Sequence, residues 1–500
     1  MIQPNLPTFL ERAQHGNLVP VSREILADQD TPVSAYEKLR TALRSEDPNA
    51  CTFLLESVEG GENIARYSML GGMPRAVVRA RNGTVTHTHA DGINTFTDRE
   101  PLAVLEEIMS RYQPVHDPSL PRFTGGAVGF LGYDCVAGFD KVPLSPTPGL
   151  DFPDMVFLIA DTVILFDQVR HTMKLVANAL IEDDPEAAYA DALARIERLA
   201  ALLQTPLPRR VLDANVPDID LPHSSNTRKP DFLRAVEASR EYIRAGDIIQ
   251  VVLSQRFTVE GSDDPLQVYR ALRSINPSPY MFCLELGDVA LAGSSPEVHV
   301  RNEERQVDIR PIAGTRKRGA TEQEDQHLEA DLLADPKERA EHVMLVDLAR
   351  NDIGRVCEWG SVNLTEFMII ERYSHVMHIV SNVRGHLRED QNSYDLMRAT
   401  FPAGTLSGAP KIRAMEIIAE LEPDRRGPYG GAVGYFGFDG NLDCCITIRT
   451  CFFEGNRTHV QAGAGLVADS VPETEFEETV NKAKGMMKAL ALARGLGEPS

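Results

Sequence analysis

Apolar residues recur with helical spacing on both sides of a proline-rich, polar stretch, and shorter apolar runs fill much of the remaining chain. The segments 185–204 and 232–246 repeat apolar positions every three to four residues, so each predicts a helix. The prolines and polar residues between them predict a linker. We therefore expect the following organisation: an N-terminal region at 1–204, a linker at 205–230 and a C-terminal domain at 231–495.

The C-terminal domain combines predicted strands with predicted helices. Runs rich in β-branched, aromatic or other apolar residues predict strands at 248–260, 281–286, 288–293, 307–314, 430–438, 442–454 and 458–468. Helical patterns occupy 264–275, an acidic region at 321–356, the segment 409–422 and the C-terminal end. Because strands often follow one another directly, we expect hairpins, antiparallel sheets and an α+β fold. The most apolar run, 155–166, is too short to span a membrane and predicts one buried strand.

One ten-residue pattern occurs twice. Residues 125–134 read GGAVGFLGYD, and residues 430–439 read GGAVGYFGFD. Shared strand chemistry or chance could produce this likeness, but we favour a duplicated sheet element with one copy in each part of the chain. Glycine inside a strand often marks the close approach of another backbone.

Composition narrows the possible partners. The chain has 500 residues, a net charge of −22 and seven cysteines without a CxxC spacing. Such an acidic protein is a poor partner for nucleic acid or anionic membranes. The cysteines indicate neither a disulfide framework nor a zinc site. The first residues lack the basic and apolar stretches of a secretory signal, so we expect a cytoplasmic protein.

Two pairs of carboxylates are the most informative candidates for a functional site. Glu338 and Glu341, like Glu475 and Glu478, are three residues apart on a predicted helix, so each pair shares one helix face. Four hard oxygen donors near a glycine-rich segment suit a divalent cation that holds an anionic substrate. Alternatively, each face is simply solvated, and Glu338 also fits a helix-capping position after Asp335 and Pro336.

Other residues allow two interpretations. Glycine-bearing loops predicted at PIAGTRKRG, PAGTLSGAPK, YGGAVGYFG and QAGAGLV could bind an anion or could be ordinary turns. His378 lies in an apolar strand, as a core residue or as an acid–base group. Arg449 lies in the predicted strand 442–454, where it needs either a structural carboxylate or a substrate carboxylate.

Taken in order, many segments of this chain resemble the chorismate-utilising enzymes, and most closely the aminase subunits that make anthranilate. The matching segments are LLES, PSPYMF, SSPE, RPIAGTR, EHVMLVDLARND, SHVMHIVS, PAGTLSGAPK, YGGAVGYF and QAGAGLVADSVPETEFEET. The resemblance implies an α/β sandwich, with two large antiparallel sheets packed face to face and helices outside. It also implies that ammonia adds to chorismate at C2, that the C4 hydroxyl leaves, and that pyruvate is then eliminated.

The resemblance assigns roles to individual residues. Mg²⁺ is expected to bind Glu341 and Glu478 directly, with Glu338 and Glu475 acting through water or as outer ligands. The expected chorismate contacts are Gly314, Thr315, Tyr429, Arg449, Lys482 and the backbone of Gly463, Ala464 and Gly465. Glu297 is the expected acid for loss of the C4 hydroxyl, His378 the expected acid–base group for pyruvate elimination, and Thr405 lines the site.

Two positions discriminate within this family. Isochorismate and salicylate synthases have a water-activating lysine where this chain has Gln250, and aminodeoxychorismate synthases have a lysine where this chain has Ala313. Gln250 argues against the addition of water, and Ala313 argues against an aminodeoxychorismate synthase, so both differences favour anthranilate formation. A non-catalytic amino-acid sensor on the same scaffold requires the carboxylates and His378 to be idle. No glutaminase sequence is present. The resemblance therefore implies a separate glutamine amidotransferase subunit and a heterotetramer of the two components.

The resemblance also implies feedback inhibition by L-tryptophan. The expected inhibitor contacts are Leu55, Glu56, Ser57, Pro279, Tyr280 and Met281. Some relatives have a lysine ten residues after the LLES serine, where this chain has Tyr67. Read locally, LLES could equally be the end of a strand and PSPYM a proline turn.

Overall fold

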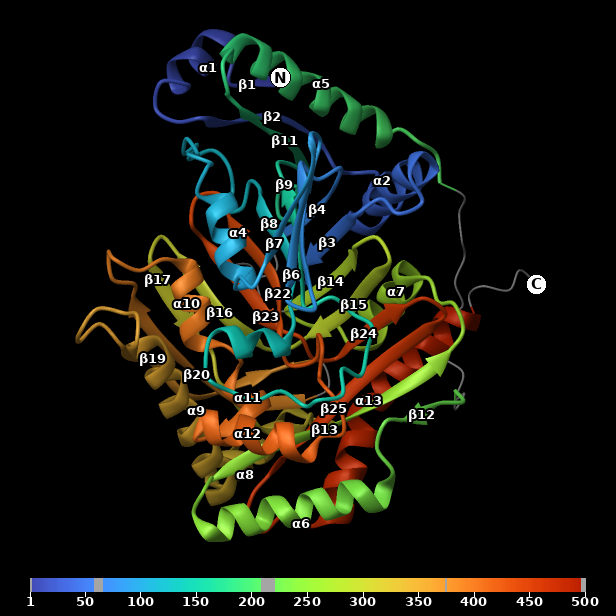
Figure 1. The fold of residues 1–500 in the computed structure, drawn as a ribbon, viewed down its shortest axis with the longest axis vertical. Coiled ribbons are helices and arrows are strands. Elements are labelled where there is room, and N and C mark those ends of the chain that lie inside the picture. Colours follow the sequence, from blue (N-terminus) through green and yellow to red (C-terminus); the bar gives the residue numbers. More distant parts are fainter. Residues whose placement is uncertain (1, 58–65, 208–220, 374–375, 496–500) are drawn as a thin grey trace.

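The computed structural model describes residues 2–57, 66–207, 221–373 and 376–495, whose strands form two antiparallel sheets of thirteen and twelve strands (Figure 1). In spatial order, sheet 1 contains β1 (Ile2–Gln3), β2 (Leu18–Leu26), β11 (Thr172–Leu180), β10 (Thr162–Asp167), β4 (Tyr67–Gly72), β3 (Thr52–Glu56), β14 (Tyr280–Glu285), β15 (Val289–Ser295), β24 (Thr450–Glu454), β25 (Arg457–Leu466), β13 (Gln250–Glu260) and β12 (Ser224–Ser225), with β21 (Gly408–Ala409) beside β13. Sheet 2 contains β18 (Ile312–Lys317), β20 (Val376–His386), β17 (Gln306–Ile309), β16 (Val298–Glu303), β23 (Leu442–Ile446), β22 (Ala432–Gly437), β8 (Gly126–Leu131), β9 (Met155–Ala160), β5 (Ala76–Arg81), β6 (Thr84–His89) and β7 (Gly92–Thr97), with β19 (Asn363–Arg372) beside β20.

The helices cover the outer faces of the two sheets, as predicted. Their bounds are α1 (Leu6–Arg12), α2 (Pro32–Glu46), α4 (Pro101–Met109), α5 (Pro185–Leu202), α6 (Lys229–Ala245), α7 (Pro265–Ile275), α8 (Glu322–Ala334), α9 (Pro336–Gly354), α10 (Ser393–Thr400), α11 (Gly404–Ser407), α12 (Lys411–Leu421) and α13 (Pro472–Gly495). Apolar side chains of α2, α5, α7 and α13 pack on sheet 1, and those of α4, α9 and α10 pack on sheet 2. Between the sheets, Phe53 and Phe282 meet Phe130 and Val433 in a buried layer. The predicted α+β sandwich is confirmed.

The two copies of the repeated pattern are neighbouring strands of sheet 2. β8 and β22 are neighbours (Figure 1). They pair antiparallel, and Gly129 lies directly opposite its counterpart Gly434. A side-chain carbon on Gly129 would lie 1.9 Å from the carbonyl oxygen of Val156, and one on Gly434 would lie 2.1 Å from that of Asp443. Glycine is therefore required at both positions, because the neighbouring strands approach too closely for any side chain.

Two segments that were each predicted as one strand instead pass from one sheet to the other. Residues 155–166 divide at Asp161, between β9 in sheet 2 and β10 in sheet 1. Residues 442–454 divide between β23 in sheet 2 and β24 in sheet 1, and Arg449 lies in the connection with φ of 52° rather than inside a strand. Single-strand predictions are wrong here because both sheets bury these residues, so hydrophobicity does not change where the chain crosses.

Two further elements have boundaries that differ from those predicted from the sequence. The predicted strand 307–314 breaks at Arg310 and Pro311, since proline has no N–H to donate to a sheet ladder. The acidic region 321–356 forms two helices that meet at Asp335. The carboxylate of Asp335 accepts hydrogen bonds from the N–H groups of Lys337 and Glu338 and so begins α9.

Both sheets take strands from both sides of the predicted linker. β3 pairs with β14 in sheet 1, and β8 pairs with β22 in sheet 2. The middle of the linker, 208–220, lies outside the described residues. In the described part of the chain, no helix is long and apolar enough to cross a membrane.

Candidate functional site

The four predicted metal-binding glutamates differ in exposure, since the Glu338 side chain is 25% exposed and that of Glu478 is 43% exposed. Glu338 and Glu341 on α9 are partly buried, as are Glu475 and Glu478 on α13, while Glu477 beside them is exposed. This difference argues against two fully solvated helix faces. The alternative of a cap for Glu338 also fails, because the N–H of Asp335 bonds to the carbonyls of Asp331 and Leu332, not to the Glu338 carboxylate.

The two carboxylate pairs crowd negative charge at the beginnings of α9 and α13. Burial and then the neighbouring Glu341 raise the pKa of Glu338. Burial also raises the pKa of Glu475, with a further contribution from Glu478. Lys337, at the start of α9, lowers the pKa of Glu475, so the two helix starts lie close to each other.

This donor set fits a hard divalent cation. Carboxylate oxygens are the ligands that Mg²⁺ prefers, and a cation would relieve the repulsion within each pair. In the described part of the chain, no three acidic, histidine or cysteine side chains already form a closed cluster. Instead, Glu341 Oε1 accepts a hydrogen bond from Gln250 at 3.4 Å, and Glu478 forms an ion pair with Lys482 at 2.7 Å.

The segment 463–465 fell both in the predicted strand 458–468 and in a predicted glycine-bearing loop, and it lies inside β25 (Arg457–Leu466), so the strand prediction is confirmed. A side-chain carbon on Gly463 would lie 2.7 Å from the Tyr429 hydroxyl, and one on Gly465 would lie 2.7 Å from Gln250 Nε2. Ala464, between them, turns its methyl group into the core formed with α6 and α12. The two glycines therefore expose backbone to the site, and Lys482 donates a hydrogen bond to the carbonyl of Gly463 at 3.0 Å.

Arg449 is a largely buried cation without a carboxylate partner among the described residues. Burial lowers the pKa of Arg449, and the nearby Tyr429 acts in the opposite direction. The alternative of a structural salt bridge therefore receives no support. A buried guanidinium needs an anion, and a ligand carboxylate can accept two parallel hydrogen bonds from it.

His378 on β20 forms a hydrogen bond to β18, and this bond determines which tautomer the neutral imidazole adopts. His378 Nδ1 lies 2.9 Å from the carbonyl oxygen of Gly314 and 3.1 Å from the hydroxyl of Thr315. Because a carbonyl only accepts, Nδ1 carries the hydrogen and neutral His378 has its lone pair on Nε2. Burial lowers the pKa of His378, and Arg449 contributes to the same effect.

Glu297 and Thr405 line one pocket of about 380 Å³, including its open mouth. Burial raises the pKa of Glu297 to about 7, against the opposing effects of Thr405 and then Lys482. The Thr405 hydroxyl is buried and has no hydrogen-bond partner of good geometry among the described residues. The structure therefore brings Glu297, Lys482 and the glutamate pairs into one connected site.

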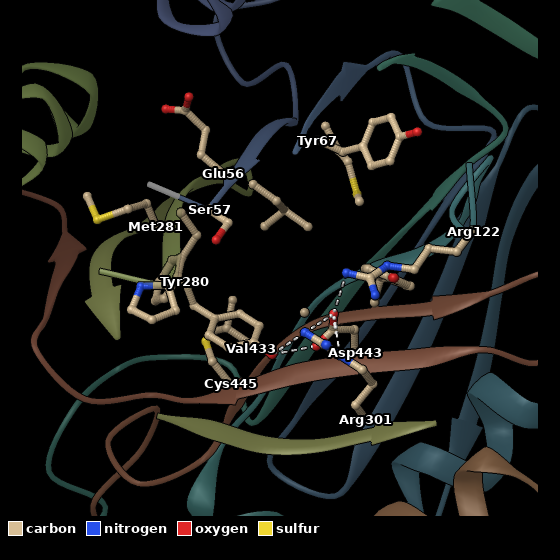
Figure 2. Close-up of a pocket in the computed structure, with 16 residues that line it drawn as sticks. Glu56, Ser57, Tyr67, Arg122, Tyr280, Met281, Arg301, Val433, Asp443 and Cys445 are labelled. Atoms are coloured by element: carbon tan, nitrogen blue, oxygen red, sulfur yellow. Dashed lines mark hydrogen bonds and ion pairs between the residues drawn. The ribbon is translucent and has the colours of Figure 1, made fainter. Parts of the chain in front are cut away.

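A second pocket, of about 530 Å³ including its mouth, lies between the two sheets (Figure 2). All six residues expected to contact an inhibitor line it: Leu55, Glu56, Ser57, Pro279, Tyr280 and Met281. β3 and β14 are paired, with Met281 opposite Glu56, so LLES and PSPYM meet although more than 200 residues separate them. Figure 2 shows the Glu56 carboxylate turned away from the pocket, where it accepts a hydrogen bond from Tyr269 and pairs with Arg273.

Comparisons with known proteins identify the family. A family model described as chorismate binding enzyme matches residues 51–488. Proteins named anthranilate synthase component 1 from Pseudomonas putida and Acetivibrio thermocellus are 50% and 47% identical, over 98% of this chain and 99% of each relative. The chain belongs to the chorismate-binding enzymes. The crystal structure of anthranilate synthase component I from Streptococcus pneumoniae superposes with a TM-score of 0.76 at 36% identity, covering 93% of this chain and 99% of that one.

In this chorismate-binding enzyme, sequence reasoning missed the charged wall of the second pocket. Arg122 and Arg301 both lie against Asp443, at 3.5 and 3.0 Å, and Tyr280 donates a hydrogen bond to the same carboxylate at 2.8 Å. Tyr67 also lines the pocket. Each of these charges is isolated within or beside an apolar strand, so only their convergence in space reveals the cluster.

The raised pKa of Glu297 predicts a pH-dependent stability. Between the ordinary pKa of 4.5 and about 7, the unfolded chain releases the Glu297 proton while the folded protein retains it. The free energy of unfolding of the wild type should therefore fall as pH rises through this window. Glu297→Gln removes the effect, so the variant should gain stability relative to wild type at pH 8 compared with pH 4.5. Urea unfolding at both pH values measures this, and an equal difference at the two would contradict the assignment.

Proposed function

We propose that this enzyme converts chorismate and ammonia into anthranilate and pyruvate, the first step of tryptophan biosynthesis. The observation that carries the proposal is the identity of two positions. Gln250, against Glu341 and Gly465, offers no amine to activate water, and Ala313 offers none to attack the ring. The names of the relatives support the same reaction.

Substrate binding relies on opposite charges at two ends of the site. Arg449 would pair with a carboxylate of chorismate, while the Tyr429 hydroxyl and the backbone of β25 contact the ring substituents. Gly314 and Thr315 would bind beside His378. Mg²⁺ would be held by Glu341 and Glu478, with Glu338 and Glu475 outside them. When bound, this ion would orient the ring carboxylate and offset its charge.

Two residues supply the proton transfers. Glu297, with its pKa near 7, is protonated in part of the population at neutral pH and can give a proton to the departing C4 hydroxyl. Ammonia forms the new bond at C2 as water leaves. His378 is neutral at that pH, and its Nε2 can accept the C2 proton as the bond between ring C3 and the enolpyruvyl oxygen breaks. That proton can then pass to the methylene carbon of the departing group, which gives pyruvate.

Ammonia is proposed to come from a separate glutamine amidotransferase subunit, since the chain contains no glutaminase sequence. The name "component 1" of the relatives supports a second component. We propose a heterotetramer of two chains of each kind.

The second pocket is proposed to bind L-tryptophan as a feedback inhibitor. Ser57 would bond the amino-acid backbone of the inhibitor, and Tyr280 would form part of the wall around its indole. The charged cluster of Arg122, Arg301 and Asp443 offers groups of both signs at the far wall of the pocket.

The reaction product gives the first test. With chorismate, ammonium and Mg²⁺, the purified chain should form fluorescent anthranilate and pyruvate, and glutamine should replace ammonium poorly. Glu478→Gln should lower the rate about 100-fold or more, since metal ligands exceed outer-shell residues in their effect. Glu477→Gln, on the exposed side of the same helix, is the matched control and should keep the wild-type rate. A product that retains its enolpyruvyl group would identify an aminodeoxychorismate synthase instead.

A substitution in the second pocket tests the regulation. Ser57→Arg places a long cationic side chain beside Arg122 and Arg301, so tryptophan inhibition should be lost while anthranilate formation without tryptophan continues. Ser45→Arg, at an exposed position of α2, is the control and should remain inhibited. Inhibition curves for anthranilate formation measure both. Unchanged inhibition in Ser57→Arg would exclude this pocket.

A further inference from the structure

Arg426 is the largest fully buried side chain among the described residues, with 1% of its surface exposed. It lies in the connection between α12 and β22, three residues before Tyr429. We propose that Arg426, held by Glu422, is a positioning residue that fixes three walls of the chorismate site relative to one another. This inference rests on the proposed function, and nothing in the sequence patterns pointed to it.

Glu422 holds the guanidinium of Arg426 from one side. Its carboxylate accepts hydrogen bonds from Arg426 Nη2 at 2.6 Å and from Nε at 2.9 Å. The same carboxylate accepts two more from the N–H and the hydroxyl of Ser254, both at 2.8 Å. Glu422 is therefore saturated with donors, which orients the plane of the guanidinium.

The remaining donors of Arg426 reach two segments that carry site residues. Nη1 donates to the carbonyl of Leu406 at 2.6 Å, next to Thr405 in α11. Nη2 also donates to the carbonyl of Val252 at 2.7 Å, and Val252 lies opposite Gly465 in the pairing of β13 with β25. One side chain thus ties the Thr405 turn to the glycine-bearing strand.

The third wall is aromatic. The guanidinium carbon of Arg426 lies 4.7 Å from the ring centre of Tyr133 and 5.6 Å from that of Tyr429. The Tyr429 hydroxyl lies over Gly463, where a side-chain carbon would come within 2.7 Å of it. A cation held against the Tyr429 ring restricts where that hydroxyl meets a substrate.

A contribution to folding stability does not by itself explain why Arg426 and Glu422 form a buried ion pair. Replacing a buried ion pair by apolar residues of similar volume is often neutral or stabilising, because desolvation offsets much of the attraction. Here the bonds of the pair end on the segments that carry Thr405, Tyr429 and the glycines. A planar side chain with five donors can meet all of them at once, whereas lysine cannot.

Arg426→Lys tests the proposal. Lysine keeps the charge but loses the fork of donors and the flat face, so the KM for chorismate should rise roughly tenfold. The KM for ammonium should change little. The matched control is Arg40→Lys, because Arg40 forms a similar buried pair with Glu285, at 2.7 Å, between α2 and β14. That variant should lose thermal stability to a similar extent and keep the wild-type KM for chorismate.

Two further variants keep the test decisive if Arg426→Lys does not fold. Glu422→Gln keeps Arg426 and the carbonyl groups that it binds but removes the negative charge that orients the guanidinium. A smaller rise in the KM for chorismate is therefore expected. The double variant Glu422→Gln, Arg426→Met removes both charges and should regain thermal stability without regaining the wild-type KM. A wild-type KM in any of these folded variants, or an equal rise in Arg40→Lys, would overturn the proposal.

The assay follows chorismate consumption as well as anthranilate. Wild-type protein that consumes chorismate but releases a different product would refute the proposed function, and the comparison of KM values would still test Arg426. The assay therefore distinguishes failure of the proposed function from failure of the proposed role of Arg426.

Discussion

The chain has to pass between two stacked sheets, and wherever it does so the backbone leaves its hydrogen-bonded ladder. Glu297 lies at the passage from β15 to β16, and Arg449 lies at the passage from β23 to β24. Side chains at such points do not have to follow the alternating faces of a strand, although a paired strand begins or ends on either side of each crossing. At the passage from β9 to β10, by contrast, Asp161 is neutralised by Arg75 and Arg195. Arg449, which has no carboxylate partner in the part of the chain that the structure describes, thus differs from Asp161 at that crossing.

Electrostatics divides the site into two ends. The carboxylates of α9 and α13 accumulate negative charge, which raises the pKa of Glu338 and Glu475 and favours a cation. Arg449 provides positive charge near Tyr429 and His378, and no carboxylate among residues 2–57, 66–207, 221–373 and 376–495 pairs with it. The proposed dianionic substrate and a metal ion held by the glutamates would satisfy both ends, although the protein as a whole carries a charge of −22. Local desolvated charges outweigh the distant ones, which water and salt screen.

Sequence patterns predicted the features that depend on local spacing. The helices that carry the glutamates follow from periodicity and from the Asp335 cap, and antiparallel pairing follows from adjacent strands. The crossing at Asp161 escaped prediction because apolar residues continue through it. The segment 463–465 left strand and loop open, since glycine and alanine have low strand propensity, and pairing with β13 decides for the strand. Arg426 could not be found either, because an arginine between a helix and a strand ordinarily lies at the surface.

We propose that the two glutamate pairs hold a divalent cation that the reaction requires. The most direct measurement is the rate of anthranilate formation from chorismate and ammonium after treatment with EDTA, followed by stepwise addition of Mg²⁺. We expect the rate to fall to background in the chelator and to recover along a saturable curve as Mg²⁺ is restored. A full rate in the presence of excess chelator would contradict it.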